Sequence, residues 1–136
     1  MFRQTNKHGQ IKLMSDLFIL IVDDSPTMRR IIKNTLERLG HRESVEASNG
    51  KEALQQLEEH PINFIITDWN MPEMNGLEFV TELRTTPEYA KIPVLMITTR
   101  GMKDDVLQAV QAGVNNYVVK PFTPETLEQK MNKLLA

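Results

Sequence analysis

Short apolar runs alternate along this chain with segments of helical periodicity, and this alternation constrains the fold more than any other feature. Residues 17–22 read LFILIV, a continuous apolar run that is typical of a strand buried on both faces. Similar runs at 62–67 and 92–98 predict two more buried strands, and shorter strands are expected at 42–47 and 116–119.

Helix signals lie between and after these strands. Ser25-Pro26 offers an N-cap residue followed by proline at the first helical position, and Gly40 marks the end of that helix. Thr123-Pro124 repeats the signal before a last helix. The expected helices cover residues 26–39, 49–60, 76–84, 103–112 and 124–136.

Strands that alternate with helices, and that are apolar throughout, favour a parallel sheet covered on both faces. Because crossovers between parallel strands are right-handed, the sequence predicts an α/β fold with a doubly wound, five-stranded parallel sheet and helices on both faces. We interpret residues 16–136 as one domain. Residues 1–15 are polar and unpatterned, so we expect a flexible N-terminal extension.

Composition narrows the class of function. The formal net charge is -2, whereas nucleic-acid binding usually requires a basic surface, so no nucleic-acid partner is expected. The chain has no cysteine, which excludes disulfides and thiolate metal sites. No apolar run has the ~18 residues of a membrane span, so we expect a cytoplasmic protein that does not bind membranes.

Ligands of doubly wound folds bind at the carboxyl ends of the strands, so the residues that follow each strand are the candidate site. These positions hold three carboxylates, two hydroxyls and one ammonium group: Asp23, Asp24, Asp68, Thr98, Thr99 and Lys120. Any one of them could be an ordinary turn or capping residue. Their expected convergence from four segments at one edge of the sheet indicates a functional site.

Neighbouring carboxylates repel one another by about 4 kcal/mol for a pair ~4 Å apart at an effective dielectric of ~20. A hard divalent cation would neutralise them, and Mg²⁺ commonly binds one or two carboxylates together with phosphate oxygens. With Lys120 and a hydroxyl beside the acids, the cluster suits a phosphoryl group, and one carboxylate is a candidate nucleophile.

Other phosphate and metal motifs fit less well. The segment DWNMPEMNGLEF fails the calcium-loop pattern at its fifth, sixth and twelfth positions. Neither GxxxxGK[ST] nor GxGxxG occurs. A phosphatase with an aspartyl-phosphate intermediate would carry an acid two residues after its nucleophile, whereas Asn70 follows Asp68 at that distance.

The motifs DDSPTMRRI, DWNMP and NNYVVKPFT resemble those of response regulator receiver domains of two-component systems. The resemblance covers residues 16–136 and is strongest to the single-domain regulators of chemotaxis. It implies a flavodoxin-like sheet with strand order 2-1-3-4-5. It also implies a cis peptide bond between Lys120 and Pro121.

The resemblance assigns a role to each residue of the acidic cluster. Asp68 matches the phosphoacceptor, which takes a phosphoryl group from a phosphohistidine of a kinase. Asp24 and Asp68 match direct ligands of Mg²⁺, with the main-chain carbonyl of Asn70 as a third ligand. Asp23 matches the acid that holds the metal through water, and Lys120 the residue that pairs with the phosphoryl group.

The same resemblance implies a switch. Thr98 matches a hydroxyl that moves on phosphorylation, and Tyr117 an aromatic ring that then turns inward. The chain departs from the chemotaxis pattern after Thr98, where Thr99 and Arg100 replace Ala and Glu. Arg100 therefore places a basic group near the phosphoryl site, where it can alter the lifetime of the phosphorylated form.

A partner-binding face is also implied, with a partial match to the family. It comprises Gly101, Met102, Lys103, Val106, Tyr117 and Lys130. The implied partners are a sensor histidine kinase of the chemotaxis type, a flagellar switch protein and a phosphatase.

The sequence therefore predicts a signalling phosphoacceptor rather than an enzyme with a separate substrate, one that catalyses only its own phosphorylation and dephosphorylation. A phosphorelay receiver that passes its phosphoryl group to another histidine protein is the main alternative. A hydrolase of small phosphate esters and a degenerate receiver that only binds are further alternatives. Asn70 argues against the hydrolase, and the full set of acids with Thr98 and Lys120 argues against the degenerate receiver.

Overall fold

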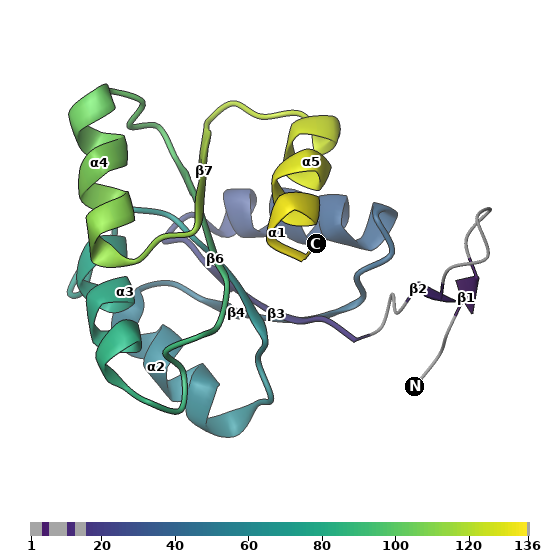
Figure 1. The fold of residues 1–136 in the computed structure, drawn as a ribbon, viewed down its shortest axis with the longest axis horizontal. Helices are drawn as coiled ribbons and strands as arrows, with labels where there is room; N and C mark the ends of the chain where they lie inside the picture. Colours follow the sequence, from purple (N-terminus) through teal and green to yellow (C-terminus); the bar gives the residue numbers. More distant parts are fainter. Residues whose placement is uncertain (1–3, 6–10, 13–15, 136) are drawn as a thin grey trace.

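The computed structural model describes residues 4–5, 11–12 and 16–135 of the chain. Five parallel strands form the main sheet (Figure 1). They are β3 (Phe18–Val22), β4 (Glu43–Ala47), β5 (Phe64–Thr67), β6 (Val94–Thr98) and β7 (Asn116–Val119). Their order in the sheet, β4-β3-β5-β6-β7, confirms the predicted order 2-1-3-4-5.

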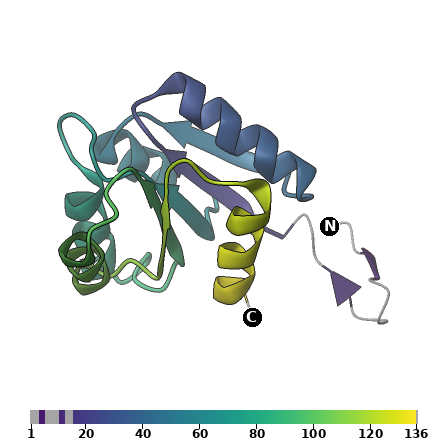
Figure 2. The same ribbon diagram turned by 90° about the horizontal axis from the view of Figure 1, so that it is seen from above.

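Five helices cover the two faces of this sheet. They are α1 (Pro26–Arg38), α2 (Gly50–Glu59), α3 (Gly76–Thr85), α4 (Lys103–Ala112) and α5 (Pro124–Leu135). Figures 1 and 2 show α1 and α5 on one face, with α2, α3 and α4 on the other. The predicted doubly wound α/β fold is confirmed.

A separate hydrophobic layer lies on each face of the sheet. Ile65 of β5 packs into the layer that contains Phe79 of α3. Its neighbour Ile66 packs into the opposite layer, with Ile32 of α1 and Leu127 of α5. Successive residues of a strand point to opposite faces, so a strand covered on both sides must be apolar throughout.

Side chains cap the starts of α1 and α3, and the cap at Ser25 is predicted from the sequence. The hydroxyl of Ser25 accepts a hydrogen bond from the N–H of Met28 at 3.1 Å, ahead of Pro26 at the first helical position. Asn75 and Glu78 bond reciprocally to each other's main chain at the start of α3. These bonds satisfy N–H groups that a helix leaves without partners in its first turn.

Two strands begin later than their apolar runs. In the segment before β5, the N–H of Ile62 bonds to the carbonyl of His60 at 2.9 Å, so it is used in a turn rather than in the sheet. Pro93 precedes β6 and has no N–H to donate to a neighbouring strand. Apolar character therefore extends beyond the residues that pair.

The N-terminal region contains a pair of strands that the sequence did not predict. Residues Gln4–Thr5 (β1) and Ile11–Lys12 (β2) pair in an antiparallel arrangement. The other positions of the predicted extension, residues 1–3, 6–10 and 13–15, lie outside the described residues, and its flexibility stays a prediction.

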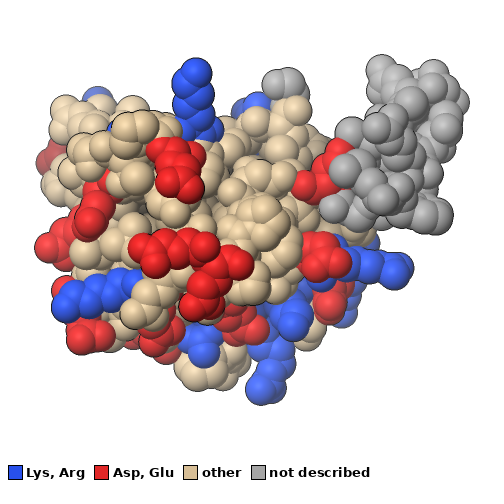
Figure 3. All heavy atoms as spheres, turned by 90° about the horizontal axis from the view of Figure 1, so that it is seen from below, with Lys and Arg blue, Asp and Glu red and all other residues tan. Residues whose placement is uncertain are grey.

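Within the described part of the chain, no helix combines the length and the apolar character needed to cross a membrane. Figure 3 shows acidic and basic side chains interspersed on one face of the molecule. Mixed charge of this kind creates no large field of a single sign on that face.

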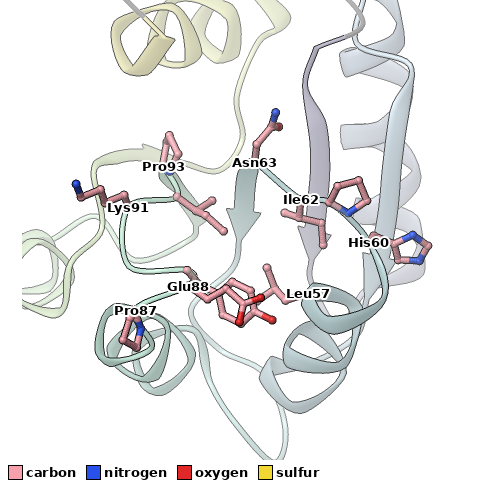
Figure 4. A pocket seen from close by; sticks show the side chains of 11 residues that line it. Leu57, His60, Ile62, Asn63, Pro87, Glu88, Lys91 and Pro93 are labelled. Atoms are coloured by element: carbon pink, nitrogen blue, oxygen red, sulfur yellow. The ribbon is translucent and has the colours of Figure 1, made fainter. Parts of the chain in front are cut away.

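A cleft of about 530 Å³ lies at the amino ends of β5 and β6, as Figure 4 shows. Leu57, Ile62, Pro87, Glu88, Lys91 and Pro93 are among its lining residues. The predicted acidic site follows the carboxyl ends of the strands, so the cleft lies at the opposite edge of the sheet and lacks these acids.

Candidate phosphoacceptor and metal site

The structure brings together the three aspartates that follow β3 and β5. One oxygen from each of Asp23, Asp24 and Asp68 lies within 4.8 Å of the others. Asp23 and Asp68 are buried, with 1% and 9% of their surface exposed, whereas Asp24 is exposed. The cluster is therefore buried at Asp23 and Asp68 and open to solvent at Asp24.

Backbone hydrogen bonds between neighbouring strands fix where these residues lie. The N–H of Asp23 donates to Ala47 at 3.1 Å, and the N–H of Asp68 donates to Val22 at 2.8 Å. The N–H of Lys120 donates to the carbonyl of Thr98 at 2.8 Å. Each of these residues thus continues the bonding pattern of the sheet by one position beyond the end of its strand.

Lys120 bridges two of the aspartates from the far edge of the sheet. Its Nζ lies 2.9 Å from Oδ2 of Asp23 and 3.2 Å from Oδ2 of Asp68. Burial by itself would lower the pKa of Lys120, but the two carboxylates together raise it above its usual value. The ammonium group is therefore charged at neutral pH and partly neutralises the cluster.

Main-chain N–H groups hold the remaining oxygens of the two buried acids. Oδ1 of Asp23 accepts from the N–H of Ser25 at 2.9 Å, and Oδ1 of Asp68 accepts from Trp69 at 2.6 Å. Burial raises the pKa of Asp23, although Ser25 and Lys120 oppose this shift. The free energy cost of burying this charge favours a further cation at the site.

The composition of the cluster fits Mg²⁺. Three carboxylates and one ammonium group leave an excess of negative charge, and each of the three aspartates offers a carboxylate oxygen as a ligand. Hard oxygen ligands with one open side suit a small divalent cation that retains some of its water. Asn70 is exposed two residues after Asp68, and its main-chain carbonyl as a metal ligand stays a prediction.

The loop after Asp68 leaves almost no space at Gly76. A Cβ atom at this position would lie 2.0 Å from the carbonyl oxygen of Asp68. The N–H of Gly76 also donates to the carbonyl of Trp69 at 2.8 Å. The first residue of α3 therefore packs directly against the main chain of the candidate phosphoacceptor.

The two predicted switch residues are linked through the β6–α4 loop. Thr98 is fully buried, and its hydroxyl accepts a long hydrogen bond of 3.4 Å from the N–H of Arg100. The hydroxyl of the half-buried Tyr117 donates to the carbonyl of Arg100 at 2.5 Å. Burial raises the pKa of Tyr117 to about 12, with the charge of Asp105 as a further cause.

Contacts of the Arg100 side chain were not predicted from the sequence. The guanidinium carbon lies 4.3 Å from the centre of the Trp69 ring, and Nη1 lies 3.4 Å from Oδ1 of Asp105. Asp105 is the third residue of α4, a position where an acid commonly bonds back to the helix start, so the sequence signals its bond from Met102 but not its pair with Arg100. The stacking on Trp69 depends on the loop conformation and was not visible.

The predicted partner-binding residues lie in the loop before α4 and on α4, β7 and α5, which are successive elements at one end of the sheet (Figure 1). Gly101, Met102 and Lys103 are exposed, and Val106, Tyr117 and Lys130 are partly buried. Other exposed apolar side chains on these elements are Leu107, Val110, Val119 and Leu135. Such apolar exposure is a common feature of protein-binding surfaces.

The predicted cis peptide bond at Lys120-Pro121 is confirmed.

Comparison of the sequence with known proteins identifies relatives of this chain. Residues 19–132 match the response regulator receiver domain family. The chain is 54% identical to a chemotaxis protein CheY homolog of Campylobacter jejuni over 86% of this chain and 91% of that protein. It is 53% identical to chemotaxis protein CheY1 of Helicobacter pylori, over 86% of this chain and 95% of that protein.

Solved structures of a chemotaxis protein and of a response regulator also match this chain. The crystallized chemotaxis protein CheY4 of Vibrio cholerae superposes with a TM-score of 0.81 at 36% sequence identity. The match covers 87% of this chain and 98% of that one. A response regulator structure from Chloroflexus aurantiacus matches with a TM-score of 0.82 at 31% identity, over 88% and 97% of the two chains.

Proposed function

The chain belongs to the response regulator receiver family, as a domain of the CheY chemotaxis type, and we propose that Asp68 is its phosphoacceptor. A sensor histidine kinase of the chemotaxis type donates the phosphoryl group in a Mg²⁺-dependent reaction in the cytoplasm. Phosphorylation then changes binding to a downstream target such as the flagellar motor switch.

One observation carries this proposal: Asp68 lies where two other carboxylates and one ammonium group converge. A single acid at the end of a strand would have an ordinary structural explanation. Burying a charge beside like charges costs free energy, and such arrangements occur mainly at functional sites.

The geometry suits transfer of a phosphoryl group to Asp68. An oxygen of its carboxylate forms a bond to phosphorus while the phosphorus–nitrogen bond of the phosphohistidine breaks, and the imidazole leaves with a proton. Lys120, 3.2 Å from Oδ2 of Asp68, is placed to pair with the transferred oxygens. When bound, Mg²⁺ supplies charge neutralisation for the incoming phosphoryl group. Asp23, Asp24 and Asp68 would hold it, with the Asn70 carbonyl.

The switch lies beside this site. We assign the role of responding to the phosphoryl group to Thr98, with Tyr117 as the ring that changes position. The support is that Tyr117 bonds to the carbonyl of Arg100, two residues after Thr98. A shift of the loop toward the phosphoryl group would break or remake this bond. The partner-binding face begins at Gly101, next in the chain.

The experiment is incubation with Mg²⁺ and acetyl phosphate, followed by detection of an acid-stable, base-labile phosphoprotein. We expect labelling of the wild type only with Mg²⁺ present, and none of Asp68→Asn. Asp104→Asn is the matched control, because Asp104 is an exposed aspartate outside the cluster. Label that persists in Asp68→Asn would overturn the assignment.

The partners require a second experiment. A flagellar switch protein and a purified histidine phosphotransfer protein are each mixed with labelled and unlabelled wild type. Tighter binding of the labelled form to the switch protein supports the proposal. Transfer of the label to the histidine protein, without a change in switch binding, would favour the phosphorelay alternative. A phosphatase that removes the label is a further proposed partner.

A further inference from the structure

Arg100 links the surroundings of Asp68 to the start of α4. Its guanidinium group stacks over the ring of Trp69, and the N–H of Trp69 donates to Oδ1 of Asp68. The same guanidinium group pairs with Asp105 in the first turn of α4. Arg100 thus contacts the immediate neighbour of the phosphoacceptor and also an acid of the helix that begins the predicted partner-binding face.

The pair between Arg100 and Asp105 is weak. The two atoms are 3.4 Å apart, and the side chain of Arg100 is 41% exposed. Solvent-exposed ion pairs of this kind contribute little to stability. Asp105 also accepts a long hydrogen bond of 3.3 Å from the N–H of Met102. The present partner of Arg100 can therefore be replaced by a stronger anion at little cost.

A phosphoryl group on Asp68 would be such an anion. It carries about two negative charges with three acceptor oxygens, and a planar guanidinium group pairs with such oxygens through two parallel hydrogen bonds. Lys120 is already shared between Asp23 and Asp68. Arg100 lies close to this site, because its guanidinium group stacks 4.3 Å from the centre of the Trp69 ring and the N–H of Trp69 bonds to Asp68.

We propose that Arg100 exchanges partners on phosphorylation, leaving Asp105 for the phosphoryl group on Asp68, and that this exchange frees the first turn of α4. The inference rests on the proposed function, because it requires a phosphoryl group at Asp68. It assigns to Arg100 a regulatory role: Asp105 competes with the phosphoryl group for the same guanidinium group. The start of α4 and the bond from Tyr117 to the Arg100 carbonyl respond together.

The competition makes a specific prediction about pairs of variants. The probe is beryllofluoride with Mg²⁺, a phosphoryl analogue, and its binding is followed through the fluorescence of Trp69, the single tryptophan. Asp105→Asn removes the competitor and should tighten probe binding by about two- to fivefold. Arg100→Gln removes the guanidinium group and should weaken probe binding by about tenfold. In the Arg100→Gln background, Asp105→Asn should have no effect.

The decisive readout is whether the effect of Asp105→Asn on probe binding depends on the presence of Arg100. Equal tightening by Asp105→Asn with and without Arg100 would overturn the exchange, because it would show only the removal of a negative charge. Asp104→Asn is the matched control, since Asp104 is the adjacent acid of the same helical turn, and equal tightening by this variant would also overturn the proposal. Circular dichroism verifies that each variant is folded.

A second measurement follows the start of α4 directly. Amide resonances of Met102 and Asp105 should shift on addition of the probe to wild type, and should shift several-fold less in Arg100→Gln once that variant is saturated. Equal shifts in both proteins would overturn the coupling. Absence of Asp68 labelling and of probe binding in wild type would instead contradict the proposed function, so the two failures are distinguishable.

Discussion

Arg84 of α3 donates two hydrogen bonds to the main-chain carbonyl of Gly113, at 3.0 Å from Nε and 2.8 Å from Nη2. Its other donors reach the carbonyls of Ala90 and Ile92 and the side chain of Asn115. Burial lowers the pKa of Arg84. One side chain thus ties α3 to the end of α4 and to the segments before β6 and β7.

We expect Arg84→Lys to lower the free energy of unfolding by about 2–4 kcal/mol. Lysine keeps the charge but cannot reach all of these acceptors from a single ammonium group, so part-buried carbonyls lose their donors. Urea denaturation measures the change. Arg42→Lys, at an exposed position, is the matched control and should change stability by less than about 0.5 kcal/mol. Equal effects of the two substitutions would contradict the role of Arg84.

The acidic cluster should limit the stability of the metal-free protein. Burial raises the pKa of Asp23, so its ionised form costs folding free energy. The corresponding stability is present below the usual aspartate pKa of 3.8 and is lost as the pH rises through the higher pKa of the folded state. At neutral pH, Asp23→Asn should therefore be more stable than wild type in the presence of EDTA.

The pH and metal dependence provide the checks for Asp23. The gain from Asp23→Asn, measured by urea denaturation, should shrink as the pH falls to 3.8 and below, where the acid is protonated in both states. Mg²⁺ should stabilise wild type more than the variant, because the variant lacks one carboxylate. A variant less stable than wild type at pH 7 without metal would show that the hydrogen bonds of Asp23 outweigh its burial.

A substitution at Gly76 should disturb the phosphoacceptor directly. The added Cβ of Gly76→Ala would lie 2.0 Å from the carbonyl oxygen of Asp68, so the main chain must move. We expect a loss of stability of about 3 kcal/mol, measured by thermal or urea denaturation, together with weaker Mg²⁺ binding. Gly101→Ala is the control, because its Cβ would meet only the side chain of Val119, at 3.3 Å. Similar losses for both would contradict the steric argument.

Tyr117 should ionise only in strong base. Its pKa of about 12 lies above the usual 10.0, so the stabilisation linked to its neutral phenol is present below pH 10 and is lost as the pH rises through 12. Ultraviolet titration should show a phenol that ionises near this pKa and that is missing in Tyr117→Phe, which leaves Tyr89 as the only tyrosine. A titration near pH 10 assigned to Tyr117 would show that its hydroxyl is exposed.

Sequence reasoning succeeded where topology alone decides the outcome. The carboxyl ends of parallel strands meet at one edge of a sheet, so the order of elements was enough to bring Asp23, Asp68 and Lys120 together. The limits of α4 and β7 also matched, because polar residues and Gly113 bound them sharply.

Features that depend on the path of a loop were not predictable in the same way. The stacking of Arg100 on Trp69 and the five hydrogen bonds of Arg84 require the conformations of segments without regular periodicity. The strand pair β1–β2 is only two residues long on each side, too short to produce an alternating pattern.

The backbone bonds from Asp23, Asp68 and Lys120 to neighbouring strands mean that the strand register sets the spacing of the charged groups in the site. A slip of one residue in β5 would present Thr67 or Trp69 where Asp68 now lies, and it would turn each hydrophobic side chain to the opposite layer. An error in strand alignment would therefore disrupt the charge cluster and the core at the same time. A molecule with its core correctly packed consequently has its acids correctly spaced, without a separate step of assembly.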